Sequence, residues 1–141
     1  MTRARVPAAV ERRVRERAGN RCEYCKLAQI GQEAVFHIDH VFPRKHGGDD
    51  TLENLALACV SCSLRKGARI DASDPVTGKA APLFNPRREV WANHFELAVG
   101  PLILGKTPTG RATADLLKMN RPEAISIRYE ESLRGRYSFP E

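Results

Sequence analysis

The chain has 141 residues, a net charge of +6 and 42% hydrophobic residues, so it is long enough for one domain with an appended subdomain and too short for several. No apolar stretch approaches the length that spans a bilayer. The first residues, Met-Thr-Arg-Ala-Arg, contain no apolar run suited to a signal peptide. We therefore expect a cytoplasmic protein that does not cross a membrane.

The positive charge gathers at the beginning of the chain, where residues 1–21 hold seven arginines and two glutamates. Residues 7–18 are predicted to form a helix closed by Gly19. Its narrow apolar stripe consists of Val10, Val14 and Ala18. The remaining surface carries Arg12, Arg13, Arg15 and Arg17. Two interpretations stay open, because such a charge run is either a solvated helix face or a surface that attracts a polyanion by neutralising its phosphates.

The middle of the chain predicts two strands and a helix. The run VFHIDHVF at residues 35–42 is apolar, β-branched and aromatic and stops at Pro43, which is typical of a strand. A loop with strong turn residues at 46–50 separates it from a short return strand at 55–58. A helix is expected to follow and to reach about Arg69.

The C-terminal part is less regular. Residues 71–86 are rich in Asp, Pro and Gly and are expected to form a loop. A helix is predicted to begin at 85–88. Residues 98–110 favour a strand or loop because Gly100, Pro101, Gly105 and Pro108 interrupt an apolar stretch. The first of these helices carries Val90, Trp91, Phe95 and Leu97. Its two aromatic residues, four positions apart, are expected to pack in the core rather than to stack on bases. Two further helices are expected at 113–119 and 122–133.

All four cysteines lie in two CxxC pairs, Cys22/Cys25 and Cys59/Cys62. Each pair lets two thiolates approach one ion, and two pairs complete a tetrahedral zinc shell, with a zinc knuckle expected at residues 20–27. Disulfides, redox dithiols and buried thiols are the alternatives. Disulfides need an oxidising compartment, and a redox motif would need one CxxC beside a strand–helix unit rather than two that use every cysteine. Four thiolates leave no open coordination position, so this zinc is expected to be structural.

The string His37-Ile38-Asp39-His40 lies between the cysteine pairs and suggests chemistry. Asp39 offers a hard oxygen ligand suited to Mg²⁺ or Mn²⁺, and a neutral His40 can take a proton from water. Hydrolysis of a phosphodiester needs both a base and a cation. Strict strand alternation sends the two side chains to opposite faces, so they serve one centre only where the strand ends or twists.

The runs CEYC, FHIDHVFPRKHGG and ENLALACVSCSLRKG resemble the zinc-containing HNH endonucleases over residues 21–66. Two later runs, LFNPRREVWANHF and GRATADLLKMN, resemble the C-terminal part of stand-alone bacterial proteins of this type. The resemblance implies an α+β fold with a ββα-metal (His-Me finger) nuclease core. We expect a basic helix at 1–20, the core with its zinc knuckle at 21–70 and an extension packed on it at 71–141.

The same resemblance implies roles for single residues. Asp39 would bind the catalytic ion, which is Mg²⁺, Mn²⁺ or another divalent ion, and His40 would be the general base. Asn54 would pin the long loop by hydrogen bonds and so orient His40. Ser63 stands where the family usually has His or Asn, and three roles stay open for it: direct ligand, holder of a metal-bound water, or none. His37, on the same strand face as Asp39, is either a further ligand or an ordinary packed histidine.

Basic residues near these positions are candidates for phosphate contacts. They are Lys66, Arg65, Arg44 and Lys45, together with Arg12 and Arg13 of the first helix. The alternative for the first four is to offset the charge of the thiolate cluster. The resemblance implies a metal-dependent endonuclease that hydrolyses DNA, most often double-stranded. Two other readings stay open: a catalytically weakened, zinc-stabilised nucleic-acid-binding module, and a protein whose basic helix meets an acidic partner.

Overall fold

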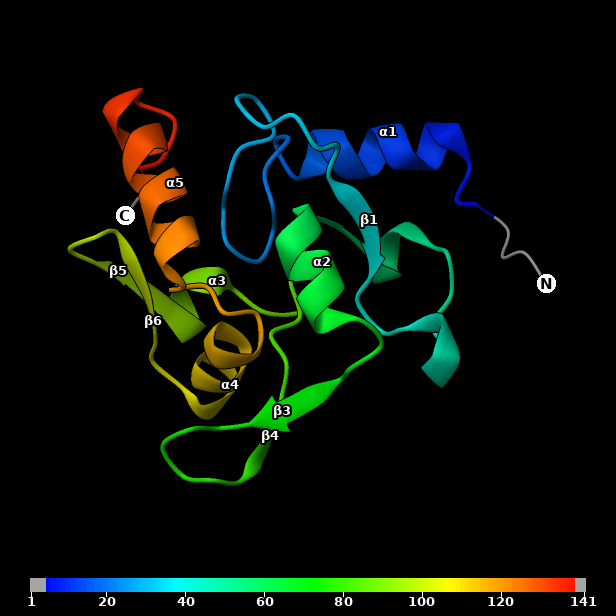
Figure 1. The fold of residues 1–141 in the computed structure, drawn as a ribbon. Coiled ribbons are helices and arrows are strands. Elements are labelled where there is room, and N and C mark those ends of the chain that lie inside the picture. Colours follow the sequence, from blue (N-terminus) through cyan, green and yellow to red (C-terminus); the bar gives the residue numbers. More distant parts are fainter. Residues whose placement is uncertain (1–4, 139–141) are drawn as a thin grey trace.

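Helix α1 (Ala8–Arg17) lies along one side of a two-stranded antiparallel sheet made of β1 (His37–His40) and β2 (Leu55–Ala58), and helix α2 (Val60–Lys66) follows β2 directly (Figure 1). The structure is a computed structural model that describes residues 5–138. Within these residues, no helix is long and apolar enough to cross a membrane. The predicted first helix, both strands and the helix after the second cysteine pair are confirmed.

Strands β1 and β2 are paired from His37 opposite Ala58 to His40 opposite Leu55. Every residue of β2 is buried, which explains why its sequence, Leu-Ala-Leu-Ala, is entirely apolar instead of alternating. The connection between the strands contains two short 3₁₀ helices, Arg44–His46 and Leu52–Asn54. The sheet therefore holds a long loop at the end where His40 lies.

The two faces of β1 carry different side chains. Successive residues of a strand point to opposite faces, so His37 and Asp39 share one face, and Ile38 and His40 share the other. Asp39 contacts Lys66 of α2, which identifies its face as the one that α2 covers. His40 therefore points away from α2, and β1 ends at this residue.

Helix α1 is anchored to the sheet by both apolar and charged side chains. Val14 is fully buried in the main core. Arg15 donates a hydrogen bond of 3.0 Å to the backbone oxygen of Phe36, and Arg17 donates to the backbone oxygens of Leu52 (2.8 Å) and Leu55 (2.5 Å). Two of the helix's arginines thus hold the helix against the sheet.

Residues 71–86, predicted as a loop, contain a hairpin instead, and the prediction was wrong. Strands β3 (Asp71–Ser73) and β4 (Ala80–Pro82) pair in antiparallel fashion. The buried carboxylate of Asp74 closes the turn between them by accepting from the Val76 N–H and the Thr77 hydroxyl. Strands of three residues are too short to show a two-residue hydrophobic period, so their sequence carries turn signals only.

The helix predicted to carry residues 90–97 is also wrong in extent. Helix α3 covers only Trp91–His94, and the chain continues as β5 (Phe95–Ala98), paired with β6 (Leu102–Gly105). The expected core packing of the two aromatic residues is confirmed, because the ring centroids of Trp91 and Phe95 lie 4.9 Å apart. Pairing with β6 satisfies the backbone of β5 and overrides the local helical pattern.

Two further helices follow, α4 (Pro108–Leu116) and α5 (Pro122–Leu133). The bounds of α5 are those expected from the sequence, whereas α4 begins five residues and ends three residues before the expected helix at 113–119. Figure 1 shows α4, α5 and the β5–β6 pair on the side of α2 opposite to β1. Their apolar residues Phe95, Ile103, Leu117 and Met119 belong to the same core cluster as Val14 of α1 and all of β2. The extension after residue 70 is therefore continuous with the core of the first half.

Candidate functional site

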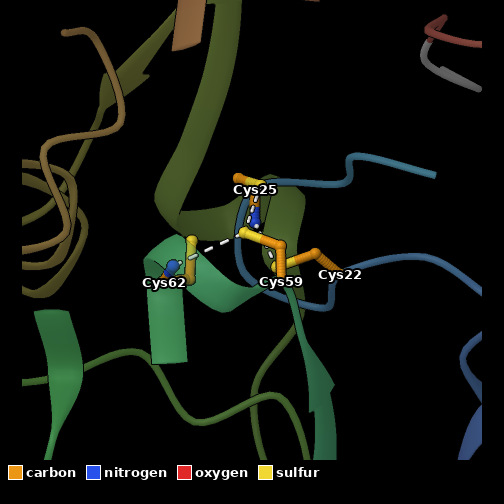
Figure 2. Close-up of side chains that lie close together, drawn as sticks. All are labelled: Cys22, Cys25, Cys59 and Cys62. Carbon is orange, nitrogen blue, oxygen red and sulfur yellow. Dashed lines mark hydrogen bonds between the residues drawn. The ribbon is translucent and has the colours of Figure 1, made fainter. Parts of the chain in front are cut away.

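The four cysteines come together, as their spacing predicts. Their sulfur atoms all lie within 4.8 Å of one another, all four residues are buried, and the thiols are free (Figure 2). The Sγ atoms of Cys25 and Cys59 are 3.7 Å apart, close to the roughly 3.8 Å between thiolates of a tetrahedron with Zn–S bonds of about 2.3 Å. The cluster can therefore bind a structural metal such as zinc.

Backbone N–H groups already face two of the sulfurs. The N–H of Cys25 lies 3.4 Å from Sγ of Cys22, and the N–H of Cys62 lies 3.4 Å from Sγ of Cys59. Hydrogen bonds from the other three thiols lower the pKa of the Cys59 thiol. Such donors stabilise negative charge on sulfur, which is the form that binds a metal.

The C-terminal extension clamps this knuckle from outside. The Tyr137 hydroxyl donates to the backbone oxygen of Cys25 (2.6 Å), and the Trp91 indole N–H donates to that of Tyr24 (2.8 Å). Arg87 forms an ion pair with the carboxylate of Glu23, which itself accepts the backbone N–H of Leu57 at 2.9 Å. Residues far apart in the sequence thus fix the cysteine turn against β2.

Asp39 lies in the interior, only 7% exposed. The Tyr24 hydroxyl donates to its Oδ2 at 2.7 Å, and the ammonium of Lys66 lies 3.3 Å from Oδ2 and 3.4 Å from Oδ1. Burial raises the pKa of the Asp39 carboxyl, and the Lys66 charge and the Tyr24 hydrogen bond act in the opposite direction. Asp39 is therefore a paired, hydrogen-bonded carboxyl between β1 and α2.

The expected role of Lys66 as a phosphate contact needs correction. Its side chain is 2% exposed, and its Nζ also donates to the backbone oxygen of His40 at 3.0 Å. A phosphate does not reach an ammonium that is enclosed in this way. Lys66 points inward because it lies on the face of α2 that packs on β1.

His37 and Ser63 are neighbours on the same side of the sheet. The Nδ1 atom of His37 is 2.9 Å from Oγ of Ser63, and both residues are partly buried. The serine hydroxyl is thus engaged by an imidazole that comes from the strand carrying Asp39. The carboxylate of Asp39, the imidazole of His37 and the hydroxyl of Ser63 therefore all lie between β1 and α2.

This arrangement fits a cation beside Asp39. The Lys66 ammonium is itself a stand-in cation, because it contacts both carboxylate oxygens of Asp39 and the carbonyl oxygen of His40. These are the oxygen donors that a divalent ion prefers. Such an ion and the Lys66 ammonium compete for the same carboxylate.

His40 lies on the opposite face of β1 and has a partner that the sequence did not single out. Its Nε2 is 2.7 Å from Oδ1 of Asp50, a loop residue. Arg44 holds the same carboxylate in a fork, with Nε 3.0 Å from Oδ1 and Nη2 3.0 Å from Oδ2. Hydrogen bonds from His40 and Arg44 lower the pKa of the Asp50 carboxyl. His40 thus faces an ionised carboxylate that is itself oriented.

Asn54 closes the loop between the strands. Its side-chain oxygen accepts the N–H of Phe42 at 2.9 Å, and its amide nitrogen donates to the backbone oxygens of Phe42 (2.9 Å) and Asp49 (2.8 Å). Gly48 is required at the closest approach, because a Cβ there would lie 1.7 Å from the oxygen of Phe42. The loop that presents Asp50 to His40 is therefore fastened at both ends.

Residues 22–69 match the family model described as HNH endonuclease. These residues, about a third of the chain, are similar to HNH endonucleases, and we call them the HNH segment. The curated proteins gave no match, and the solved structures gave none either. HNH domains act on nucleic acids, and the family consists in general of nucleases, so the match assigns nuclease or nucleic-acid-binding activity to this segment.

Several of the expected basic residues lie at the surface of the HNH segment and of α1. Lys45 and Arg65 are exposed, and so are Arg12 and Arg13 of α1. A groove of about 500 Å³ runs between α1 and β1. Its lining includes His40, Arg44, Arg15 and Arg5. The groove brings the imidazole of His40 to a surface of predominantly positive charge.

Sequence reasoning missed three residues of this HNH segment. Asp50 is one of two adjacent aspartates, and nothing in the spacing tells which one reaches His40. Tyr24, inside the first CxxC pair, resembles a spacer residue but donates to Asp39. Phe42 follows a half-buried strand and is 45% exposed, which the apolar run around it does not indicate.

Proposed function

We propose that this protein is a metal-dependent endonuclease that hydrolyses phosphodiester bonds in DNA, with His40 as the general base that activates water. One observation carries the proposal: within the matched HNH segment, His40 is oriented by Asp50 at the rim of a groove lined by arginines. A base that is positioned by a carboxylate and open to a cationic groove has the geometry that hydrolysis of an anionic substrate needs.

The hydrogen bond between His40 and Asp50 decides which ring nitrogen of His40 is basic. Because Nε2 lies 2.7 Å from an Asp50 oxygen, we assign the proton to Nε2, and this leaves the lone pair on Nδ1. Nδ1 then takes a proton from the attacking water, and Asp50 stabilises the imidazolium that results. Arg44, bidentate on Asp50, keeps the carboxylate in place while the charge on the ring changes.

Asp39 is the residue that would hold the catalytic divalent ion, with His37 and Ser63 nearby on the same side of the sheet. When bound, the ion would stabilise the negative charge of the phosphate and of the departing oxygen. The position that Lys66 takes touches both Asp39 and the backbone of His40. Asp39, which would hold the cation, and His40, the base, are thus adjacent residues at the end of β1. Their side chains leave the strand on opposite faces.

A second function, a nucleic-acid-binding module that cuts weakly, has two contacts in its favour. Lys66 already neutralises Asp39, and Ser63 is engaged by His37. Both contacts suit a module that binds nucleic acid but cuts weakly, because the ion has to displace an internal ammonium. The two candidates differ in whether added metal produces cleavage.

The test is nicking of supercoiled plasmid by the full chain in Mg²⁺, in Mn²⁺ and in EDTA. We expect wild type to nick with at least one metal and His40→Gln, which keeps a side chain able to bond Asp50 but no base, to lose about a hundredfold or more of the rate. Circular dichroism and zinc content check that the variant is folded. Equal rates for wild type and His40→Gln under every metal would overturn the assignment, and binding without nicking would favour the second function.

A further inference from the structure

Phe42 is a large aromatic side chain on the surface of the HNH segment, two residues after His40. It is 45% exposed, whereas its chain neighbours Val41 and Pro43 are buried. Single exposed apolar residues are ordinary on protein surfaces. The position of Phe42 is different because of how its backbone is held and what surrounds it.

The backbone of Phe42 is held rigidly. Both its N–H and its carbonyl oxygen are bonded to the side chain of Asn54, each at 2.9 Å, and Gly48 lies against the same carbonyl. The ring has one aromatic neighbour, His46, with centroids 6.0 Å apart and planes inclined by 55°. The backbone of Phe42 is therefore held rigidly, and the ring that it carries is only partly covered.

Charged side chains of both signs lie near this ring, and Arg44 among them is paired with Asp50. Arg44 and Lys45 follow it within three residues, on the 3₁₀ helix. On its other side, Phe42 lines a groove of about 450 Å³ together with Asn54 and Arg88, and Arg88 is exposed. Two acidic residues, Asp49 and Glu53, also line this groove. The exposed Lys45 and Arg88 are the cations near the aromatic face, and a base that stacks on a ring needs such cations for the phosphates beside it.

The distance to His40 fits a neighbouring nucleotide. Phe42 is two residues from His40, so their Cα atoms are at most about 7 Å apart, which is comparable to the length of one nucleotide unit. A phosphate at His40 thus has the base of the same or the next nucleotide near Phe42. In an intact duplex, the two faces of each base are covered by its stacked neighbours, so a protein ring reaches only a base that is unpaired or unstacked.

We propose that Phe42 is a stacking platform for an unpaired base next to the cut phosphate, so that the preferred substrate is single-stranded or locally unpaired DNA. The proposal rests on the proposed function only in placing the cut phosphate at His40; binding of the base requires no catalysis. It narrows the substrate from DNA in general to DNA with an exposed base face.

The experiment uses the full zinc-bound chain carrying His40→Gln, so that no cleavage occurs, and a single-stranded oligonucleotide containing 2-aminopurine. Fluorescence anisotropy measures affinity, and quenching of 2-aminopurine reports stacking. Phe42→Leu keeps an apolar side chain but has no aromatic face, and Phe42→Trp keeps the face. Val76→Ala, at an exposed apolar residue of the β3–β4 turn, is the control for the loss of surface hydrophobicity.

We expect Phe42→Leu to bind the single strand about fivefold to a hundredfold more weakly, the range for one stacked base, and to lose the quenching. Phe42→Trp and Val76→Ala should keep both, and none of the changes should alter duplex affinity by more than about threefold. The proposal is overturned if Phe42→Leu binds and quenches like the parent, or if Phe42→Trp fails as badly as Phe42→Leu. If the wild-type chain nicks plasmid but Phe42→Leu shows no defect, only the stacking role is lost; if stacking is found but nicking is not, only the endonuclease role is lost.

Discussion

The ammonium of Lys66 lies 3.3 Å from Oδ2 of Asp39, and both side chains are enclosed between β1 and α2, with exposures of 2% and 7%. A carboxylate and an ammonium that are both removed from water depend on each other, because either one alone is an uncompensated buried charge. Asp39 of the Asp-His string therefore stabilises the fold. A divalent ion that binds Asp39 does so in exchange for an internal cation.

Replacement of Lys66 by Met should reveal both roles. Loss of one partner from a buried ion pair typically costs about 3–5 kcal/mol, and we expect Lys66→Met to lower the free energy of unfolding by an amount in this range. The double variant Lys66→Met/Asp39→Asn should recover most of the loss, because no buried charge then remains. Urea unfolding of the zinc-bound chain measures both values.

The matched control is Arg65→Met, on the same helix but exposed, which should change the unfolding free energy by less than about 0.5 kcal/mol. Competition for Asp39 also predicts that Lys66→Met binds Mn²⁺ more tightly than wild type, by about tenfold or more, as measured by electron paramagnetic resonance of free Mn²⁺. Equal or weaker Mn²⁺ binding by a folded Lys66→Met would show that the ion does not use the carboxylate that Lys66 holds.

Asp50→Asn should impair the base without unfolding the loop. The asparagine side chain is nearly isosteric, but its amide presents either a neutral oxygen or a donor to Nε2 of His40, so the ring is less firmly held in one tautomer. We expect nicking to fall about tenfold to a hundredfold, and the ¹⁵N chemical shifts of the His40 ring to move away from the Nε2–H tautomer. These shifts are measured on the zinc-bound chain without added Mg²⁺ or Mn²⁺.

Asp49→Asn is the control for Asp50→Asn, because it removes the same charge from the adjacent residue, whose carboxylate accepts from Thr51 rather than from His40. In Asp49→Asn, the ¹⁵N chemical shifts of the His40 ring should equal those of wild type. If Asp50→Asn leaves both the shifts and the rate unchanged, the carboxylate does not orient the base.

Zinc removal should unfold the knuckle and the elements that it joins. The four thiols connect the turn before β1 with the start of α2, and they belong to the main core. Because the binding free energy of a structural zinc is also folding free energy, we expect one zinc per chain and a cooperative loss of secondary structure when a strong chelator extracts it. Elemental analysis and circular dichroism provide the two measurements. Retention of native circular dichroism after complete removal would contradict a structural role.

Local sequence patterns predicted the parts of the structure that local geometry decides. A CxxC spacing brings two sulfurs together regardless of the rest of the chain, and two such pairs predicted the four-thiol cluster. The apolar run at 35–42 and the Pro43 after it predicted the strand and its end near His40. The helices at 7–18 and 122–133 followed from spacing and from their ends in the same way.

Contacts between distant segments decided the rest. Lys66 points inward because of the rotation of α2 against β1, which no periodicity within seven helical residues specifies. The helix expected through Leu97 ends at His94, because the backbone of the following residues pairs with β6. Asp50 rather than Asp49 meets His40 because Asn54 fixes the loop in one conformation. In each case the deciding contact is made by residues outside the local pattern, so the pattern itself contains no sign of it.

Asp74 predicts a specific pH dependence of stability. Its side chain is fully buried, and hydrogen bonds from Arg111, together with those from the turn, lower the pKa of its carboxyl well below the ordinary value. A carboxyl with a lowered pKa in the folded state stabilises the fold above its unfolded pKa, near 3.9, and this contribution is lost as the pH falls toward the folded pKa. The unfolding free energy of wild type should therefore exceed that of Asp74→Asn at pH 6, and the difference should shrink below about pH 4.

Urea unfolding at pH 6, 4.5 and 3.5 tests this dependence. The exposed Asp71 of β3 provides the control, since Asp71→Asn should show a small difference from wild type that does not change with pH. A difference between wild type and Asp74→Asn that stays constant from pH 6 to pH 3.5 would mean that Arg111 does not hold the carboxyl in its ionised form.

The arginines of α1 divide into two groups with different expected effects. Arg12 and Arg13 are exposed, whereas Arg15 and Arg17 donate hydrogen bonds to backbone oxygens of the sheet and its loop. Each phosphate that a protein neutralises on duplex DNA contributes about −0.9 to the slope of log affinity against log salt. We expect Arg12→Gln/Arg13→Gln to make this slope shallower by about 1 to 2 units while the unfolding free energy stays within about 0.5 kcal/mol of wild type. Arg17→Gln is the contrasting variant: it should lower the unfolding free energy by about 1–2 kcal/mol, since two carbonyls lose a charged donor, and keep the slope. A slope that is unchanged in Arg12→Gln/Arg13→Gln would make the exposed arginines of α1 a solvated helix face.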